Sequence, residues 1–122
     1  MKDVFLPPQL PEDPDRLTDL LALVGRDGAQ ALLDQIAADL HSAQAGLAAA
    51  QVTGEWAGLR DHSHVVIAVA GTIGATGLCR TAREVNVLAH ARDSKGLDAV
   101  LPVMMDRLTA TLIWLKGHGG AP

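Results

Sequence analysis

The chain has 122 residues and a formal net charge of −4, and its sequence contains neither the basic block nor the aromatic ladder typical of nucleic-acid binding. Hydrophobic residues make up 48% and aromatic residues 2%, so aliphatic side chains must build one core, and the abundance of alanine and leucine favours helices. The single cysteine, Cys79, cannot form an internal disulfide, and without a signal-peptide pattern the sequence fits a cytoplasmic protein.

Three regions are expected along the chain: an N-terminal arm over residues 1–12, a helical bundle over residues 13–116 and a flexible, glycine-rich tail over residues 117–122. Prolines exclude a helix interior from the arm. Its apolar segment at residues 4–6 could still dock on the bundle.

Capping residues mark the first helices. Asp13 is predicted as an N-cap with Pro14 in the first helical position, and leucines at helical spacing follow until Gly25 ends this short helix. Asp27 then caps a second helix, which extends to about Ala50. The apolar row of this second helix is typical of a core-facing surface and indicates no other role.

A central helix is expected after a turn at residues 51–54, with Thr53 as its N-cap and Trp56 at the start of its buried row. It continues to about Ala75. The uncharged stretch at residues 65–79 is shorter than the roughly 20 residues of a membrane span, so no membrane crossing is expected.

Three glycines lie close together near the end of this helix: Gly71, Gly74 and Gly77. Each costs about 1 kcal/mol relative to alanine inside a helix. Their clustering indicates either the close approach of another segment or fraying toward the next turn. Gly71 is in line with His64, so access to that histidine is favoured over tight helix packing as the reason for it.

The last two helices are expected over residues 78–92 and 97–115, joined by a connection at residues 93–96. Pro102 either lies near the true start of the last helix or kinks it. Methionines at helical spacing predict core filling. Three charged residues of the first of these helices are expected to be solvated: Arg80, Arg83 and Glu84. Together the elements predict an all-α protein, an antiparallel four-helix bundle with a short additional N-terminal helix.

The central helix presents a histidine on a face of small residues. At 100° per residue, a stripe about 60° wide carries His64, Ala68, Gly71 and Ala75. The opposite side is apolar and branched, which fits a core. Because the other residues of the stripe are too small to shield the imidazole, we expect His64 to be accessible to a partner molecule.

Other chemistries are disfavoured by composition and spacing. No glycine-rich phosphate loop follows a strand, and there is no cysteine pair for zinc. His62 lies on the buried side, about 160° from His64, so the two cannot share a metal ion while the helix continues. We therefore expect His62 to be a core or boundary histidine. His64 remains as a neutral imidazole nucleophile that can hold a group covalently.

His64 followed by the segment VAGTIGA at residues 69–75 resembles the signature of histidine-containing phosphotransfer (HPt) domains. That family's pattern has an active histidine, a lysine three positions on, a glycine four positions on, then small residues and a Gly-Ala pair near the helix end. The resemblance extends over about residues 17–115. It implies a four-helix bundle without an ATP site, which relays a phosphoryl group between aspartates of receiver domains through His64.

Two positions depart from that pattern: Ile67 stands where the family has lysine, and Ala68 stands where it has glycine. The family's lysine lies beside the phosphoryl group and helps to neutralise its charge, which Ile67 cannot do. Arg60, one turn before His64 and about 40° off its line, is the predicted source of the missing positive charge. Asp61, on the other flank, is expected to be solvated rather than to orient the imidazole.

The predicted partner-docking face comprises Ile67, Ala68, Gly71 and Ala75, since receiver-docking surfaces are partly apolar. By the resemblance, the partners are response-regulator receiver domains and a hybrid sensor kinase. The charge pattern and the short uncharged stretch predict no nucleic acid and no membrane. The chain needs no cofactor of its own, and the Mg²⁺ belongs to the receiver. As a phosphoryl-transfer intermediate it turns over no small molecule, so whether it counts as an enzyme is partly a matter of naming.

Two other functions remain open. A non-catalytic HPt-like module would bind receivers or kinases without phosphoryl transfer, and Ile67 is the feature that supports it. A purely structural bundle would dimerise through an apolar face that includes Trp114. Phosphorylation separates the relay from both alternatives, and receiver binding separates the module from the structural bundle.

Overall fold

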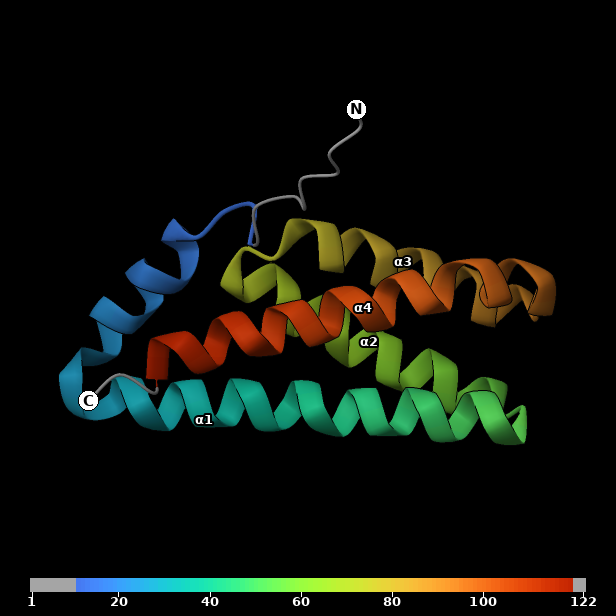
Figure 1. Ribbon diagram of the computed structural model, residues 1–122, viewed down its shortest axis with the longest axis horizontal. Helices are drawn as coiled ribbons and strands as arrows, with labels where there is room; N and C mark the ends of the chain where they lie inside the picture. The colour runs from blue at the N-terminus through green and yellow to red at the C-terminus, as the bar shows by residue number, and fades with distance from the viewer. Residues whose placement is uncertain (1–10, 120–122) are drawn as a thin grey trace, which may run out of the picture.

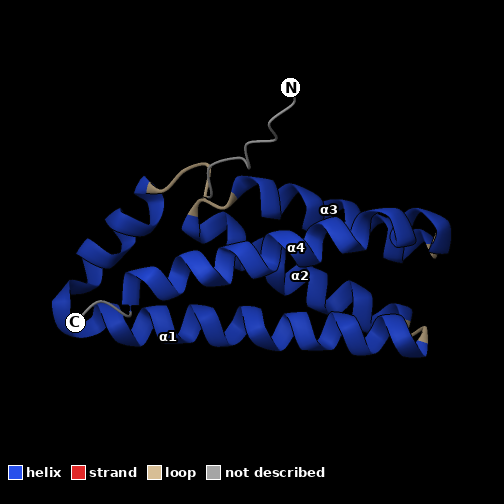
Figure 2. Ribbon diagram, in the orientation of Figure 1, coloured by secondary structure: helices blue, strands red, loops and turns tan. Residues whose placement is uncertain are grey.

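The computed structural model describes residues 11–119, and the regular structure of these residues is entirely helical (Figure 2). Four helices follow one another along the chain: α1 (Asp15–Thr53), α2 (Trp56–Ile73), α3 (Thr76–Ala91) and α4 (Ser94–Gly119). Connections of two residues join them. The all-α class predicted from composition and periodicity is therefore confirmed. Most of the predicted arm, with its apolar segment at residues 4–6, lies outside the described residues.

Helix α1 contains one break in its helical geometry, at Gly25. This residue has φ 77° and ψ 173°, a backbone conformation that glycine adopts readily and other residues rarely. Helical turns lie on both sides of it, and Figure 1 shows the leading segment of α1 turned away from the long segment that follows. The break predicted at Gly25 is confirmed, whereas Asp27, predicted as an N-cap, lies inside α1.

Left-handed glycines end α1 and α2. Gly54 (φ 72°) and Gly74 (φ 80°) each donate a backbone N–H to the carbonyl four residues earlier, which closes the last turn of the helix. Helix α2 therefore stops at Ile73, two residues before the predicted end at Ala75. The sequence alone did not show which of the clustered glycines takes the left-handed conformation.

The turn predicted at residues 51–54 is limited to residues 54–55 in the structure, and the N-cap role predicted for Thr53 is wrong. Helix α1 continues through Thr53, whose hydroxyl donates to the carbonyl of Ala49 at 3.1 Å instead of capping α2. Asp13 is not an N-cap either, because Pro14 occupies that position and no side chain caps the first turn. Local sequence placed both boundaries within a few residues but assigned the capping groups incorrectly.

Helix α4 begins earlier than predicted, at Ser94 rather than after a connection at residues 93–96. The carboxylate of Asp93 accepts the backbone N–H of Gly96 at 2.9 Å, which satisfies a donor of the first turn. Because this bond stabilises the turn, helical geometry includes residues that the pattern assigned to a loop.

The last helix also extends further than predicted. Helix α4 includes residues 117–119, which were assigned to the flexible tail, while residues 120–122 lie outside the described part of the chain. Pro102 lies inside α4 and is exposed to solvent, where water can hydrate the carbonyl that loses its helical partner. The alternative that placed Pro102 at the start of the helix is therefore excluded.

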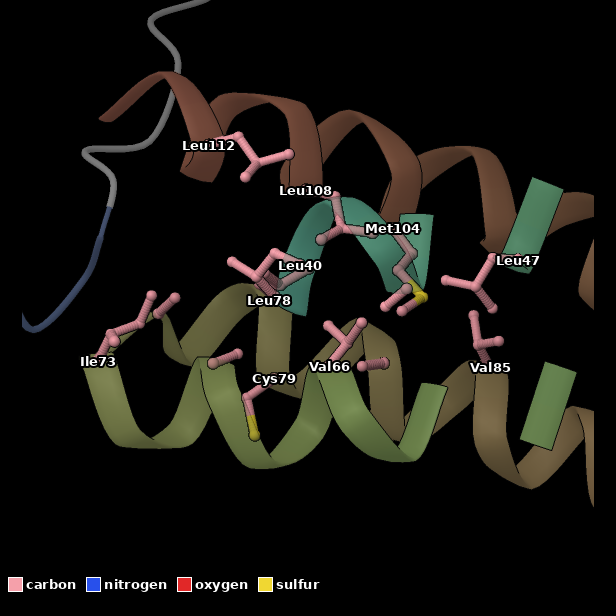
Figure 3. Close-up of a cluster of buried hydrophobic side chains, with 14 of the residues drawn as sticks. Leu40, Leu47, Val66, Ile73, Leu78, Cys79, Val85, Met104, Leu108 and Leu112 are labelled. Atoms are coloured by element: carbon pink, nitrogen blue, oxygen red, sulfur yellow. The ribbon is translucent and has the colours of Figure 1, made fainter. Parts of the chain in front are cut away.

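The helices pack in a ring in which α1 and α3 each contact both α2 and α4. Their inward faces are aliphatic, and Met104 is fully buried, so its predicted role as a core residue is confirmed. Figure 3 shows part of this core, in which ten side chains are labelled: Leu40, Leu47, Val66, Ile73, Leu78, Cys79, Val85, Met104, Leu108 and Leu112. Fully burying an aliphatic side chain contributes about 1.5–3 kcal/mol, so the core holds α2 firmly against its neighbours.

The residues before α1 lie across the connection between α2 and α3. Asp13 donates its backbone N–H to the carbonyl of Gly74 at 3.0 Å, and a Cβ at Gly74 would overlap the carbonyl of Asp13. Glu12 and Arg107 form an ion pair at 3.7 Å, and a Cβ at Gly77 would overlap both side chains. Close approach of another segment, one of the two explanations for the glycine cluster, therefore holds for Gly74 and Gly77.

Candidate functional site

His64 is exposed on α2, on the side of the helix that faces away from the core. Val66 and Ile73, on the opposite side, are fully buried (Figure 3). Ala68, one turn after His64, is exposed as well, so no large side chain of the same stripe covers the imidazole there. The helix phase predicted for His64 is therefore confirmed.

The predicted docking face is shorter in the structure than in the sequence pattern. Ala75 is fully buried at the N-cap position of α3, where its N–H donates to the carbonyl of Ala70 at 2.9 Å, so it cannot contact a partner. Ala75 was placed on the exposed stripe only because the helix was expected to continue to it. The remaining predicted residues of this face are accessible to different degrees: Ala68 is exposed, while Ile67 and Gly71 are half-buried.

Gly71 marks the edge of the open face. Its carbonyl accepts a hydrogen bond from the guanidinium of Arg16 at 2.9 Å, which brings an arginine of α1 to this part of α2. A Cβ at Gly71 would meet only the Cys79 sulfur at 3.9 Å, an ordinary contact. Tight helix packing therefore does not require a glycine here, in contrast to Gly74 and Gly77.

A polar contact beneath His64 ties its turn to α3. Asn86 donates to the carbonyl of Arg60 and to the hydroxyl of Ser63, both at 3.1 Å, and Ser63 donates to the same carbonyl at 3.0 Å. In an α-helix this carbonyl also accepts the backbone N–H of His64. Asn86 therefore anchors to α3 the helical turn that carries the histidine.

Neither Ser63 nor Asn86 was predicted as a site residue. Ser63 is fully buried, and its presence on the apolar side of the central helix was the available signal for a buried polar partner. That partner could be recognised only once α3 was known to lie beside α2. All buried side-chain polar atoms of the described residues have a hydrogen-bond partner, so this contact leaves none unsatisfied.

Arg83 is a third residue whose relation to α2 was not predicted from the sequence. On α3, Cys79 contacts the carbonyl of Ile67 at 3.6 Å and Asn86 contacts that of Arg60, so both lie on the side that faces α2. Arg83 lies between them in the sequence, about 40° around the helix from Cys79. It is exposed, as predicted, but its place beside α2 was not apparent from its own helix.

Neither Arg60 nor Arg83 has a carboxylate partner in the described part of the chain. Ion pairs join Arg16 to Asp13 and Arg107 to Glu12, both at the end of the molecule where the α2–α3 connection lies. Arg60 is half-buried and Arg83 is exposed, and neither forms an ion pair with a residue in the range 11–119. Their guanidinium groups can therefore bind an anion without first breaking such a pair.

His62 has a different environment from His64. It is half-buried and packs against α1 at Gly46, where a Cβ would overlap the imidazole ring. The expectation of a boundary histidine is confirmed, and the two histidines lie on different faces of α2.

Within residues 11–119, no three metal-ligating side chains come together.

Trp114, proposed above as part of a dimer face, is half-buried on α4. Its ring lies edge-on to that of His118, with the ring centroids 4.4 Å apart. Ile113 beside it is 68% exposed. This surface belongs to α4 and therefore does not include His64.

In the described part of the chain, no helix is both long enough and apolar enough to cross a membrane. Comparisons of the chain with protein-family models, with curated proteins and with solved structures found no match.

Proposed function

We propose that this chain is a histidine phosphotransfer protein, which relays a phosphoryl group between receiver-domain aspartates through His64. The observation that carries the proposal is the exposed His64 on a helix whose other side is buried in the core and whose turn Asn86 anchors to α3. A nucleophile that must enter a partner's active site needs this combination of exposure and rigid support.

The proposal includes an antiparallel four-helix bundle with a short leading helix. Two-residue connections that each begin with a left-handed residue support the reversal of chain direction between successive helices. The break at Gly25 supports a separate leading helix. A cytoplasmic location is also part of the proposal, since Cys79, the single thiol, is buried and unpaired.

The reaction consists of two in-line displacements at phosphorus. In the first, the lone pair of the unprotonated nitrogen of neutral His64 attacks the phosphorus of a receiver's aspartyl phosphate. An N–P bond forms, the P–O bond to the aspartyl group breaks, and the electron pair leaves with the carboxylate. In the second, a carboxylate of another receiver attacks the phosphohistidine, the P–N bond breaks and the imidazole regains its lone pair.

The chain contributes positioning and charge, while the receiver contributes its Mg²⁺ and the acceptor carboxylate. Arg60, one turn before His64, supplies a guanidinium that can neutralise the transferred group. Ile67 and Ala68 provide the small apolar contact surface beside the histidine. Receiver domains and a hybrid sensor kinase are the proposed partners.

Label transfer from receivers tests this function. The chain is incubated with a panel of phosphorylated receiver domains, and acid-labile phosphate on it is followed for the unmodified protein and for His64→Gln and His62→Gln. We expect labelling by at least one receiver, lost in His64→Gln and retained in His62→Gln. Labelling that survives in His64→Gln would contradict the assignment of the acceptor.

A second candidate function is receiver or kinase binding without phosphoryl transfer. The observation that favours it is Ile67, a half-buried apolar side chain at the position where the HPt pattern has lysine. In this case a receiver would bind the chain with the same affinity before and after His64→Gln, and neither protein would take up label.

A further inference from the structure

We infer that Arg83 of α3 is a second phosphoryl-binding residue of the His64 site, acting with Arg60 from the neighbouring helix. This inference rests on the proposed function, because the anion that the two guanidinium groups would bind is the phosphoryl group on His64. The positive charge that the HPt pattern has at the position of Ile67 on α2 would then come in part from α3.

Two contacts between α3 and α2 determine the position of Arg83 along the axis of α2. At the first, Cys79 meets the Ile67 carbonyl, and at the second, Asn86 meets the Arg60 carbonyl. At 1.5 Å per residue, the first contact is about 4.5 Å from His64 along α2 and about 6 Å from Arg83 along α3.

The contact between Asn86 and Arg60 places Arg83 at the same position along α2, measured from the N-terminal side of His64. Asn86 is about 4.5 Å from Arg83 along α3, and Arg60 is about 6 Å from His64 along α2. Both contacts therefore place Arg83 within about 1.5 Å of the level of His64. The two contacts are seven residues apart on both helices, so they describe the same alignment of α3 along α2.

The two residues also face the same way. On α2, His64 is turned about 40° from Arg60, away from the buried side; on α3, Arg83 is turned about 40° from Cys79, also away from the buried side. Both are exposed, so they open on one outer surface of the α2–α3 pair. Packed helices lie about 8–10 Å apart, a gap that the long side chain of arginine can cross to reach a group on the histidine.

Charge and geometry suit this pair of arginines to a phosphoryl group. A guanidinium presents parallel N–H donors that match two phosphate oxygens and stays charged at every physiological pH. Ile67 supplies no donor at the same face. Two carboxylates lie nearby: Asp61 is about 60° beyond His64 on α2, and Glu84 is about 100° from Arg83 on α3. Arg83 and Glu84 both line the groove between α3 and α4, so Arg83 lies where this groove meets the outer surface beside α2.

The test uses the chain phosphorylated without any receiver. Phosphoramidate transfers its phosphoryl group to histidine. A bond forms between the ring nitrogen and phosphorus, the P–N bond of phosphoramidate breaks, and its nitrogen leaves as ammonia. The phosphorus NMR signal of phospho-His64 is identified by its loss in His64→Gln. Its titration then reports the pKa of the phosphoryl group in the unmodified chain, in Arg83→Ala, in Arg83→Lys and in the control Arg26→Ala, another exposed arginine.

A nearby cation favours the dianion and lowers the pKa of the phosphoryl group, so Arg83→Ala should raise that pKa. Arg83→Lys should restore most of the shift, and Arg26→Ala should leave it unchanged. Transfer from a phosphorylated receiver should slow in Arg83→Ala on the order of tenfold, the effect of losing one charge-assisted hydrogen bond at an exposed site.

An unchanged phosphoryl pKa in Arg83→Ala would overturn the inference, and would do so even if Arg60→Ala raises that pKa. The relay can fail separately: if no receiver labels the chain, the proposed function is wrong, yet the titration of the chemically phosphorylated chain still decides the role of Arg83. If phosphoramidate labels other histidines but not His64, the site does not hold a phosphoryl group and both proposals are contradicted.

Discussion

At the scale of single residues, the difference between His62 and His64 depends on what each faces. The two are separated by one residue on α2, yet His62 packs against Gly46 of α1 and His64 is exposed. Helical geometry predicted this difference from the sequence, since it needs only the phase of one helix. The Gly46 contact could not be predicted, because it depends on how α1 and α2 pack.

We expect Arg60→Ala to slow phosphoryl transfer without unfolding the protein. The guanidinium one turn before His64 would stabilise the charge on the transferred group, and its loss should cost about tenfold in rate. Thermal unfolding should be little changed, because no ion pair within residues 11–119 is lost. A transfer rate equal to that of the unmodified chain would exclude this role.

We expect Gly46→Ala to lower the free energy of unfolding by about 1–3 kcal/mol, because the new methyl group overlaps the His62 ring. Gly117→Ala is a matched control, since Gly117 is also helical and a Cβ there would meet no atom within 4 Å. Urea denaturation measures both. Combining Gly46→Ala with His62→Ala should recover part of the loss, and no recovery would mean that another contact is responsible.

At the scale of helices, one polar contact joins the turn of α2 that carries His64 to α3. Asn86→Ala removes the donor to the Arg60 carbonyl and to Ser63, so the free energy of unfolding should fall by about 1–2 kcal/mol. Val87→Ala, at the next and exposed position of α3, is the control for helix propensity. Equal unfolding free energies for the two variants would show that the contact adds no stability.

The connection between α2 and α3 depends on the segment before α1. Gly74 and Gly54 both end helices with positive φ, but a Cβ at Gly74 would overlap Asp13, whereas one at Gly54 would meet no atom within 4 Å. Gly54→Ala should therefore cost about 1–2 kcal/mol for backbone strain alone. Gly74→Ala should cost more and should increase hydrogen exchange at Asp13. Equal costs would mean that this contact is not tight in solution.

At the scale of the whole molecule, helices were predictable because leucine periodicity and the glycine at residue 25 are local signals. Helix ends were less predictable: Thr53 bonds back to its own helix, and α4 starts at Ser94 with help from Asp93. Ala75 was misplaced on the docking face for the same reason, since it lies beyond the end of α2.

The candidate site was predictable to the extent that it lies on one helix. His64, Arg60 and Ala68 follow from a single 3.6-residue period, and the structure leaves all three at least partly accessible. Arg83 and Asn86 belong to α3, so their relation to the histidine exists only after two helices pack. For the same reason, nothing in the local sequence indicated that Arg16 of α1 bonds to Gly71 of α2.

The most direct test of the central claim is to map the phosphoryl group on the unmodified chain after incubation with one phosphorylated receiver. Peptides are separated at alkaline pH, where phosphohistidine survives, and the modified residue is located by mass spectrometry. We predict a single phosphorylated residue, His64. Phosphorylation of His62 instead, or of no residue while the receiver remains bound, would contradict the relay through His64.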